Sequence, residues 1–119
     1  MVTNRTLSDN EKEWLELVLS HEFDGRTDIV RQISSSEIKR EYTRAFLAIK
    51  FYPSKLEKPA NVKCRVPIEV RIFYQDEAPT QLFLHVVGGY VNELEIIRAD
   101  SSEITKDFNI KGVKVEFVK

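Results

Sequence analysis

Hydrophobic residues near the start of the chain recur with the spacing of a helix. In residues 8–21, Trp14, Leu15, Val18 and Leu19 form one apolar stripe, which Leu17 broadens. This spacing lines one face of a helix, and Ser8 with Glu11 forms the sequence pattern of a capping box at its start. His21 ends the stretch, where a cation suits the helix dipole. We therefore predict a helix over 8–21 that His21 caps at its C-terminus.

A second, shorter helix is predicted after Gly25 interrupts this spacing. The stretch RTDIVRQIS directs one apolar side inward, made of Ile29, Val30 and Ile33. Asp24 or Thr27 has the side chain expected of an N-cap.

From residue 37 onward the apolar residues recur every second position, which is typical of half-buried strands. The stretches interpreted as strands are EIKREYT, AFLAIKFY, CRVPIEVRIFY, TQLFLHVV, NELEIIRAD and GVKVEFVK. The longest alternation, over 64–74, contains Pro67, which cannot donate to a strand ladder and marks a bulge or an edge. The pattern predicts five or six mostly antiparallel strands.

The pair Gly88-Gly89 between two of these stretches is either a turn or part of a phosphate-binding loop. A phosphate loop needs a longer glycine pattern and a helix after it, whereas the residues after Gly89 alternate as in a strand. Two residues that tolerate positive φ are typical of a tight hairpin. We predict that strands around 82–87 and 91–97 pair antiparallel through the glycines.

Together these elements predict a single α+β domain over 1–119, with a helical part at 1–35 and a sheet at 36–119. In the simplest arrangement, two N-terminal helices pack on one mostly antiparallel five- or six-stranded sheet. The expected core consists of Trp14, Leu15, Val18, Leu19, Val66, Ile68, Val70, Leu84, Val86, Leu94 and Ile96.

Composition and charge narrow the classes of function. The formal net charge is −1, from 18 basic and 19 acidic side chains, so the chain as a whole gives no electrostatic reason to bind nucleic acid. A single cysteine, Cys64, allows no internal disulfide and fits a reducing compartment. No apolar run resembles a signal core or a membrane span. We therefore expect a cytoplasmic protein that does not enter a membrane.

His85 is the centre of the candidate acid–base or metal cluster. If the hairpin closes on the glycines, His85 lies nearly opposite residue 92 and close to Glu93 and Glu95. A histidine beside carboxylates can bind a metal or act as a base, but cross-strand charge pairs explain the same pattern. Alternation also places Cys64 on the apolar face, as a buried and inert thiol. We predict no catalytic residue, no metal and no cofactor, and keep the His85/Glu93/Glu95 face as an alternative small-molecule or metal site.

Basic residues gather between Arg31 and Lys50, interleaved with the aromatic residues Tyr42 and Phe46. Such a pattern occurs on nucleic-acid surfaces, but acidic residues such as Glu41 interrupt it, as on a mixed solvated surface. Nucleic-acid binding through this cluster is the second alternative, and we do not expect it.

Several aromatic residues fall on the strand face opposite the main apolar set, or in the turn: Phe46, Phe73, Phe83 and Tyr90. An exposed aromatic patch marks a partner site, although a sheet buried on both faces, or a register shifted by one residue, produces the same pattern. The predicted partner-binding residues are Glu69, Arg71, Phe73, Phe83 and Glu95. The final strand, Val113 to Val118, is the alternative binding edge.

Motifs in the C-terminal half resemble a group of small bacterial proteins without an assigned activity. The matching residues are Arg65-Val66-Pro67-Ile68-Glu69, Leu84-His85-Val86, Gly89-Tyr90-Val91, Glu93-Leu94-Glu95-Ile96, Arg98, Asp100 and Ser102. They are similar to the pattern HV-x-DG-x-L-x-ELEI-x-R-x-D-x-S, except that Gly88 stands where the group has an acidic residue. The resemblance implies a small cytoplasmic α+β domain, and by analogy an immunity or antitoxin protein. It carries over no active site.

These observations lead to one expected function. We expect a non-enzymatic protein-binding module of the immunity or antitoxin type, acting by occlusion of an unidentified protein partner, as a monomer or homodimer.

Overall fold

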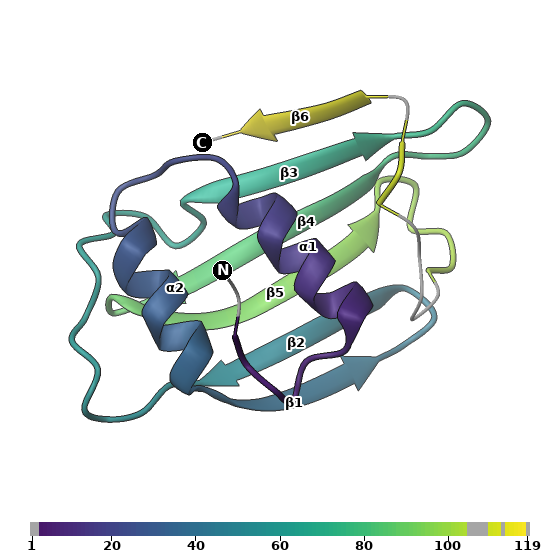
Figure 1. Ribbon diagram of the computed structural model, residues 1–119. Helices are drawn as coiled ribbons and strands as arrows, with labels where there is room; N and C mark the ends of the chain where they lie inside the picture. Colours follow the sequence, from purple (N-terminus) through teal and green to yellow (C-terminus); the bar gives the residue numbers. More distant parts are fainter. Residues whose placement is uncertain (1–2, 105–109, 113, 119) are drawn as a thin grey trace.

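The computed structural model describes residues 3–104, 110–112 and 114–118, and contains two helices followed by six strands. The elements are α1 (Asp9–Leu19), α2 (Arg26–Ser35), β1 (Glu37–Tyr42), β2 (Phe46–Tyr52), β3 (Ile68–Phe73), β4 (Thr80–Val87), β5 (Tyr90–Arg98) and β6 (Lys114–Val118). The strands form one sheet in the order β1-β2-β5-β4-β3-β6 (Figure 1), and each pair of neighbours is antiparallel. The predicted α+β class is confirmed, with six strands.

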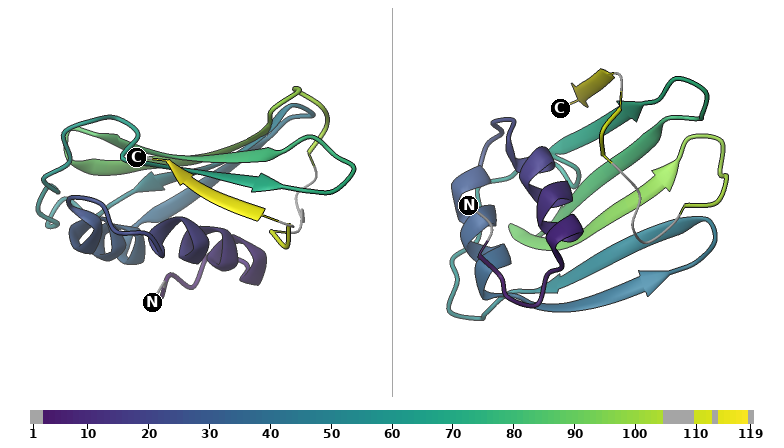
Figure 2. Two further views of the ribbon diagram at one scale, coloured as in Figure 1. Left: turned by 90° about the horizontal axis from the view of Figure 1, so that it is seen from above. Right: turned by 45° about the vertical axis from the view of Figure 1, so that its right-hand side comes forward.

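Both helices lie on the same side of the sheet, and none of the described residues forms a helix on the other side (Figure 2). The residues of α1 and α2 that the apolar spacing selects belong to one buried cluster with alternate residues of the strands. The fully buried members with the largest side chains are Trp14, Leu15, Leu19, Ile29, Ile33, Leu47, Ile49, Ile68, Ile72, Leu82, Leu84 and Leu94. Every residue of the expected core is in this cluster except Val66, which is half-buried.

The start of α1 is tied to the edge strand β1 through Glu11. Ser8 and Glu11 form the predicted capping box, in which the Ser8 N–H donates to Glu11 Oε1 at 2.8 Å. The guanidinium of Arg40 on β1 holds both oxygens of the same carboxylate, with Nη2 2.7 Å from Oε1. Burial by itself raises the pKa of Glu11, but the hydrogen bonds from Arg40 and Ser8 outweigh it and hold that pKa below the usual 4.5.

A buried amide, that of Gln32, joins α2 to the hairpin of β4 and β5. Gln32 Nε2 donates to the carbonyls of Lys58 and Gly89, at 3.1 and 3.0 Å, and Oε1 accepts from the Val91 N–H at 2.8 Å. The side chain therefore gives the buried Val91 N–H its acceptor and adds a second donor to the Gly89 carbonyl, which also accepts from the Ala60 N–H.

The predicted hairpin closes through Gly88 and Gly89, whose φ values are +60° and +86°. Between His85 and Val86 the register shifts by one residue, because His85 pairs with Glu93 while Val86 pairs with Val91. Asn92 is the extra residue of this bulge. In a regular ladder His85 would lie opposite residue 92, but because of the bulge it lies opposite Glu93.

Three further local predictions, about two helix ends and one strand, are wrong. Gly25, with φ +85°, is the N-cap of α2 instead of Asp24 or Thr27, because a Cβ at this tight turn would lie 2.7 Å from Val62 Cγ2. Helix α1 ends at Leu19 with Ser20 as its C-cap, so His21 does not cap it. The alternation of 64–74 forms a strand only from Ile68 onward.

The correction at 64–67 has a physical cause. This segment precedes Ile68, the first residue of β3 that pairs with β4, and Pro67 has no N–H to continue the ladder. A hydrogen bond from the Val86 N–H to the Arg65 carbonyl, 2.7 Å long, still ties it to β4. The segment leaves the apolar face, so Cys64 is exposed instead of buried. Of the predicted final strand, Val113 lies outside the described residues.

We predict different costs for alanine at the two hairpin glycines. A Cβ at Gly88 meets no atom within 4 Å, so Gly88→Ala should destabilise by about 1 kcal/mol, the cost of its positive φ alone. A Cβ at Gly89 would lie 2.7 Å from Pro59 Cβ and 2.9 Å from the Ala60 carbonyl oxygen. Gly89→Ala should therefore cost more than about 2 kcal/mol in urea unfolding, because backbone must also shift. Equal costs would contradict this account.

We also predict that Glu11→Gln flattens the acid dependence of stability. A carboxyl whose pKa is lower in the folded state stabilises fully above its unfolded pKa, and that stability is lost as pH falls below 4.5 through the folded pKa. Glutamine keeps the cap acceptor but removes this titration. Urea unfolding between about pH 7 and pH 3 should show a difference between the two proteins that shrinks in acid.

The exposed Glu13 on the same helix supplies the matched control, since Glu13→Gln should leave the pH dependence close to wild type. A difference between wild type and Glu11→Gln that stays constant over the whole pH range would refute the role given to Glu11.

Candidate functional site

The sheet face that no helix covers carries all of the predicted partner-binding residues. On β3, Glu69, Arg71 and Phe73 are half-buried and alternate with fully buried core residues. Phe83 on β4 and Glu95 on β5 alternate in the same way. We call this surface the open face (Figure 2). Because side chains alternate along a strand, one-sided burial brings residues from three strands together here.

The strand register sets these side chains in rows across the sheet. Glu69 pairs with Phe83, and Phe83 pairs with Glu95, so an aromatic ring lies between two carboxylates. In the next row Arg71 pairs with Gln81, and Gln81 with Ile97. Phe46 on β2 pairs with Ile97 and extends that row. The centre of the open face therefore combines aromatic and apolar side chains with charged and amide ones, all of them half-buried.

Several charged side chains of the open face form ion pairs with one another. Arg71 Nε donates to Glu69 Oε2 at 2.7 Å, and Lys50 Nζ lies 3.0 Å from Glu41 Oε1. The hydrogen bond that Arg71 donates to Glu69 raises the pKa of Arg71, and the one that Lys50 donates to Glu41 raises the pKa of Lys50. Both cations stay charged at neutral pH. The face thus has charges of both signs without a strong excess of either.

His85 lies at one end of the open face with two polar partners. Its Nε2 is 2.9 Å from Glu95 Oε1, and its Nδ1 accepts from Arg65 Nε at 3.2 Å. An arginine Nε always carries its hydrogen and can only donate. The tautomer that fits both contacts therefore has its proton on Nε2, which donates to Glu95. The structure thus brings His85 into contact with Glu95. Glu93 is the residue opposite His85 in the ladder, but the contact of the imidazole is with Glu95.

The arrangement around His85 holds the imidazole in place but supplies little chemistry. Its two nitrogens are already engaged, and a metal site needs three or more converging ligands. Within residues 3–104, 110–112 and 114–118, no group of three His, Cys, Asp or Glu side chains could hold a metal ion. The other candidate, Cys64, is on an exposed loop, since the strand predicted there begins later.

The basic residues between 31 and 50 are not brought into one stripe. Arg31 on α2 pairs with Asp28 at 2.7 Å, and Arg40 on β1 pairs with Glu11 on the helix side. Lys50 lies on the open face beside Glu41. These cations therefore face several directions, and each has a carboxylate close by.

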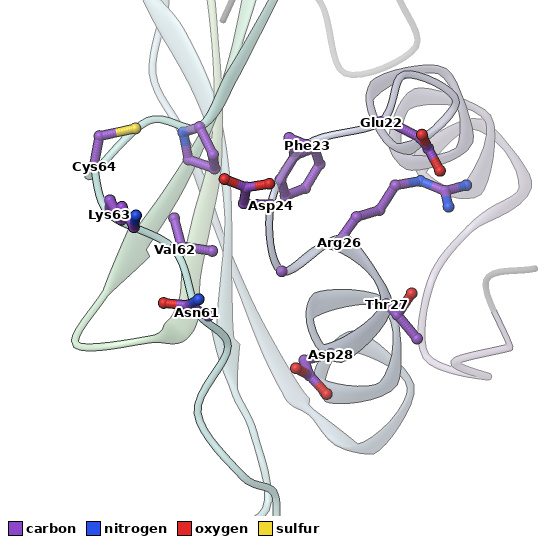
Figure 3. A pocket seen from close by; sticks show the side chains of 12 residues that line it. Glu22, Phe23, Asp24, Arg26, Thr27, Asp28, Asn61, Val62, Lys63 and Cys64 are labelled. Atoms are coloured by element: carbon purple, nitrogen blue, oxygen red, sulfur yellow. The ribbon is translucent and has the colours of Figure 1, made fainter.

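A cleft that the sequence did not indicate opens beside α2. It has a volume of about 690 Å³ and is lined by residues 22–28 on one side and by residues 61–64 and Pro67 on the other (Figure 3). These segments are far apart in the sequence and carry no shared pattern, so only the fold reveals the cleft. Its polar side chains include Asp28, which pairs with Arg31 and Lys58, and Arg26, whose Nε donates to the Leu19 carbonyl. Both therefore serve local structure.

Comparison with protein-family models, with curated proteins and with solved structures found no match. In the described part of the chain, no helix is long and apolar enough to cross a membrane.

We predict that His85→Ala changes the free energy of unfolding by less than about 1 kcal/mol, the range of a cross-strand pair. The variant should keep any biological activity of the protein largely intact, because His85 has no described nucleophile to activate. The measurement is urea unfolding together with the partner-capture assay described below. Loss of activity at unchanged stability would instead favour the His85/Glu93/Glu95 site.

Proposed function

We propose that this chain is a non-enzymatic protein-binding module, of the immunity or antitoxin type, that binds its partner through the open face and acts by occlusion. The observation that carries the proposal is the pair of half-buried rings, Phe73 and Phe83, on a sheet face that no helix covers. In a chain of this size an uncovered aromatic surface marks a partner site.

The composition of the open face fits a protein partner. Binding energy concentrates in aromatic and arginine anchors enclosed by a polar surround. Phe73, Phe83 and Arg71 supply such anchors, and Glu69 and Glu95 supply the surround. Phe73 also lies under the ammonium of Lys114, which is 5.8 Å from the ring centroid.

The rigidity of the face also favours binding by a preformed surface. Its residues lie on β3, β4 and β5, the central part of the sheet with neighbours on both sides. The opposite sides of these strands are packed in the core. Side chains held on such a support lose little freedom on binding, which reduces the entropic cost of association.

The alternative functions have less support. A small-molecule or metal-binding protein using His85, Glu93 and Glu95 is supported by the 2.9 Å contact of His85 with Glu95 alone. A nucleic-acid binder would need the cations between Arg31 and Lys50 to form a continuous surface, and their ion pairs with acidic residues argue against this.

We predict that Arg71→Glu combined with Phe83→Ala reduces partner capture by more than about tenfold, because it removes one aromatic anchor and reverses one charged anchor. The assay compares proteins retained from an extract of the source cells by immobilised wild type and by the variant. A partner identified in this way is then purified and titrated directly, and circular dichroism verifies that the variant is folded.

The matched control is Arg31→Glu combined with Leu17→Ala, which changes one charge and one half-buried apolar side chain on the helices. This control should capture the partner as wild type does. If the open-face variant also binds as wild type does while changes in β6 abolish capture, the open face is not the binding element.

A further inference from the structure

Strand β6 forms one edge of the sheet and pairs with β3 on one side only. In Figures 1 and 2 no described segment lies beyond it. An edge strand offers every second N–H and C=O to another strand, and most edges carry features that prevent such pairing. With the sequence KVEFV, β6 has neither a proline nor a described bulge.

The opposite edge, β1, is better protected. Four of its six residues are charged: Glu37, Lys39, Arg40 and Glu41. Arg40 is also tied to Glu11 and to the carbonyl of Thr6, which places the N-terminal segment beside this strand. Charged edges of this kind discourage pairing with another chain, so the two edges of the sheet differ in character.

The charges of β6 select one register for pairing with a second copy of itself. Two identical strands pair antiparallel about a two-fold axis, and opposite residues then point to the same side. A pair centred on Lys114 sets lysine against lysine, and one centred on Glu116 sets glutamate against glutamate. A pair centred on Val115 instead sets each Lys114 opposite Glu116 of the second copy and brings the two valines together.

Val115 suits the central position of this register. It is one of the large hydrophobic residues exposed on the surface, at 36%. Lys114 and Glu116 are also accessible, and their side chains already lie 3.1 Å apart within the strand. Each could therefore exchange its partner for the equivalent residue of a second copy without a change in backbone.

We propose that β6 pairs antiparallel with β6 of a second copy of this chain, centred on Val115, to give a symmetric dimer with one continuous sheet. The occupant of the edge is a second copy because the strand is complementary to itself in charge and in apolar pattern. This inference does not rest on the proposed function, because it is argued from the strand edge alone. The two surfaces are contiguous, however, since Lys114 lies over Phe73 and Glu116 pairs with Arg71.

Charge reversal at two positions tests the register. Lys114→Glu and Glu116→Lys, each made alone, set like charges opposite each other and should raise the dimer dissociation constant at least about tenfold. The double variant restores opposite charges and should dimerise nearly as wild type does. Sedimentation over a concentration series measures the constant, and Lys39→Glu on β1 is the control that should leave it unchanged.

Disulfide trapping tests the same register without charge reversal. In a Cys64→Ser background, Val115→Cys places two thiols opposite each other, within the range of a disulfide, and mild oxidation should yield a covalent dimer. Val118→Cys is the matched control. In a pair centred on Val115, the two thiols at position 118 would be offset by six residues along the strands, about 20 Å at the usual rise per residue. This variant should therefore stay monomeric on the gel.

Three results would overturn the proposal. The first is a wild-type protein that stays monomeric at all concentrations while Val115→Cys does not crosslink. The second is a dimer that neither single charge reversal weakens or that the double variant fails to restore. The third is a change in partner capture when Val115, which pairs with the core-side Ile72 and not with an open-face residue, is replaced in a monomeric protein. That result would make an extended segment of the partner the occupant of the edge.

Discussion

Burial of the sheet on one side only is the constraint on which the other features of the structure depend. Alternate residues of β3, β4 and β5 pack against the helices, so the intervening residues are held on the opposite face in fixed rows. A shift of register by one residue would bury Glu69, Arg71 and Glu95 and expose the aliphatic core. The hydrophobic effect that stabilises the core therefore also determines which side chains meet on the open face.

This constraint explains how much the sequence predicts. The α+β class, both helices and the glycine hairpin follow from local spacing, which the core enforces. The same alternation fails at Cys64, because spacing does not reveal whether a partner strand is present, and β3 pairs with β4 only from Ile68 onward. The bulge at Asn92 is likewise absent from the pattern, although it determines which carboxylate lies opposite His85.

Buried polar groups are the features least accessible to sequence reasoning. Gln32 has no apolar character to indicate burial, yet its exposed fraction is 1% and its amide completes the backbone hydrogen bonds of the hairpin. The capping box identifies Glu11 from local sequence, but the ion pair of Glu11 with Arg40 joins positions 29 residues apart. Such contacts depend on tertiary geometry, and each compensates a desolvation cost that the sequence does not display. The cleft beside α2 could not be predicted for the same reason.

The two proposals have a geometric connection. A two-fold axis that relates antiparallel edge strands runs perpendicular to the sheet, so both open faces of a β6-paired dimer would point to the same side. A partner with two equivalent sites could then engage both faces, and the second contact would form at a high effective concentration. A partner with one site would gain nothing from the dimer. If partner affinity falls when the dimer is disrupted, the partner has two equivalent sites. If partner affinity is unchanged, the partner has one site, although each open face binds in the same way in both cases.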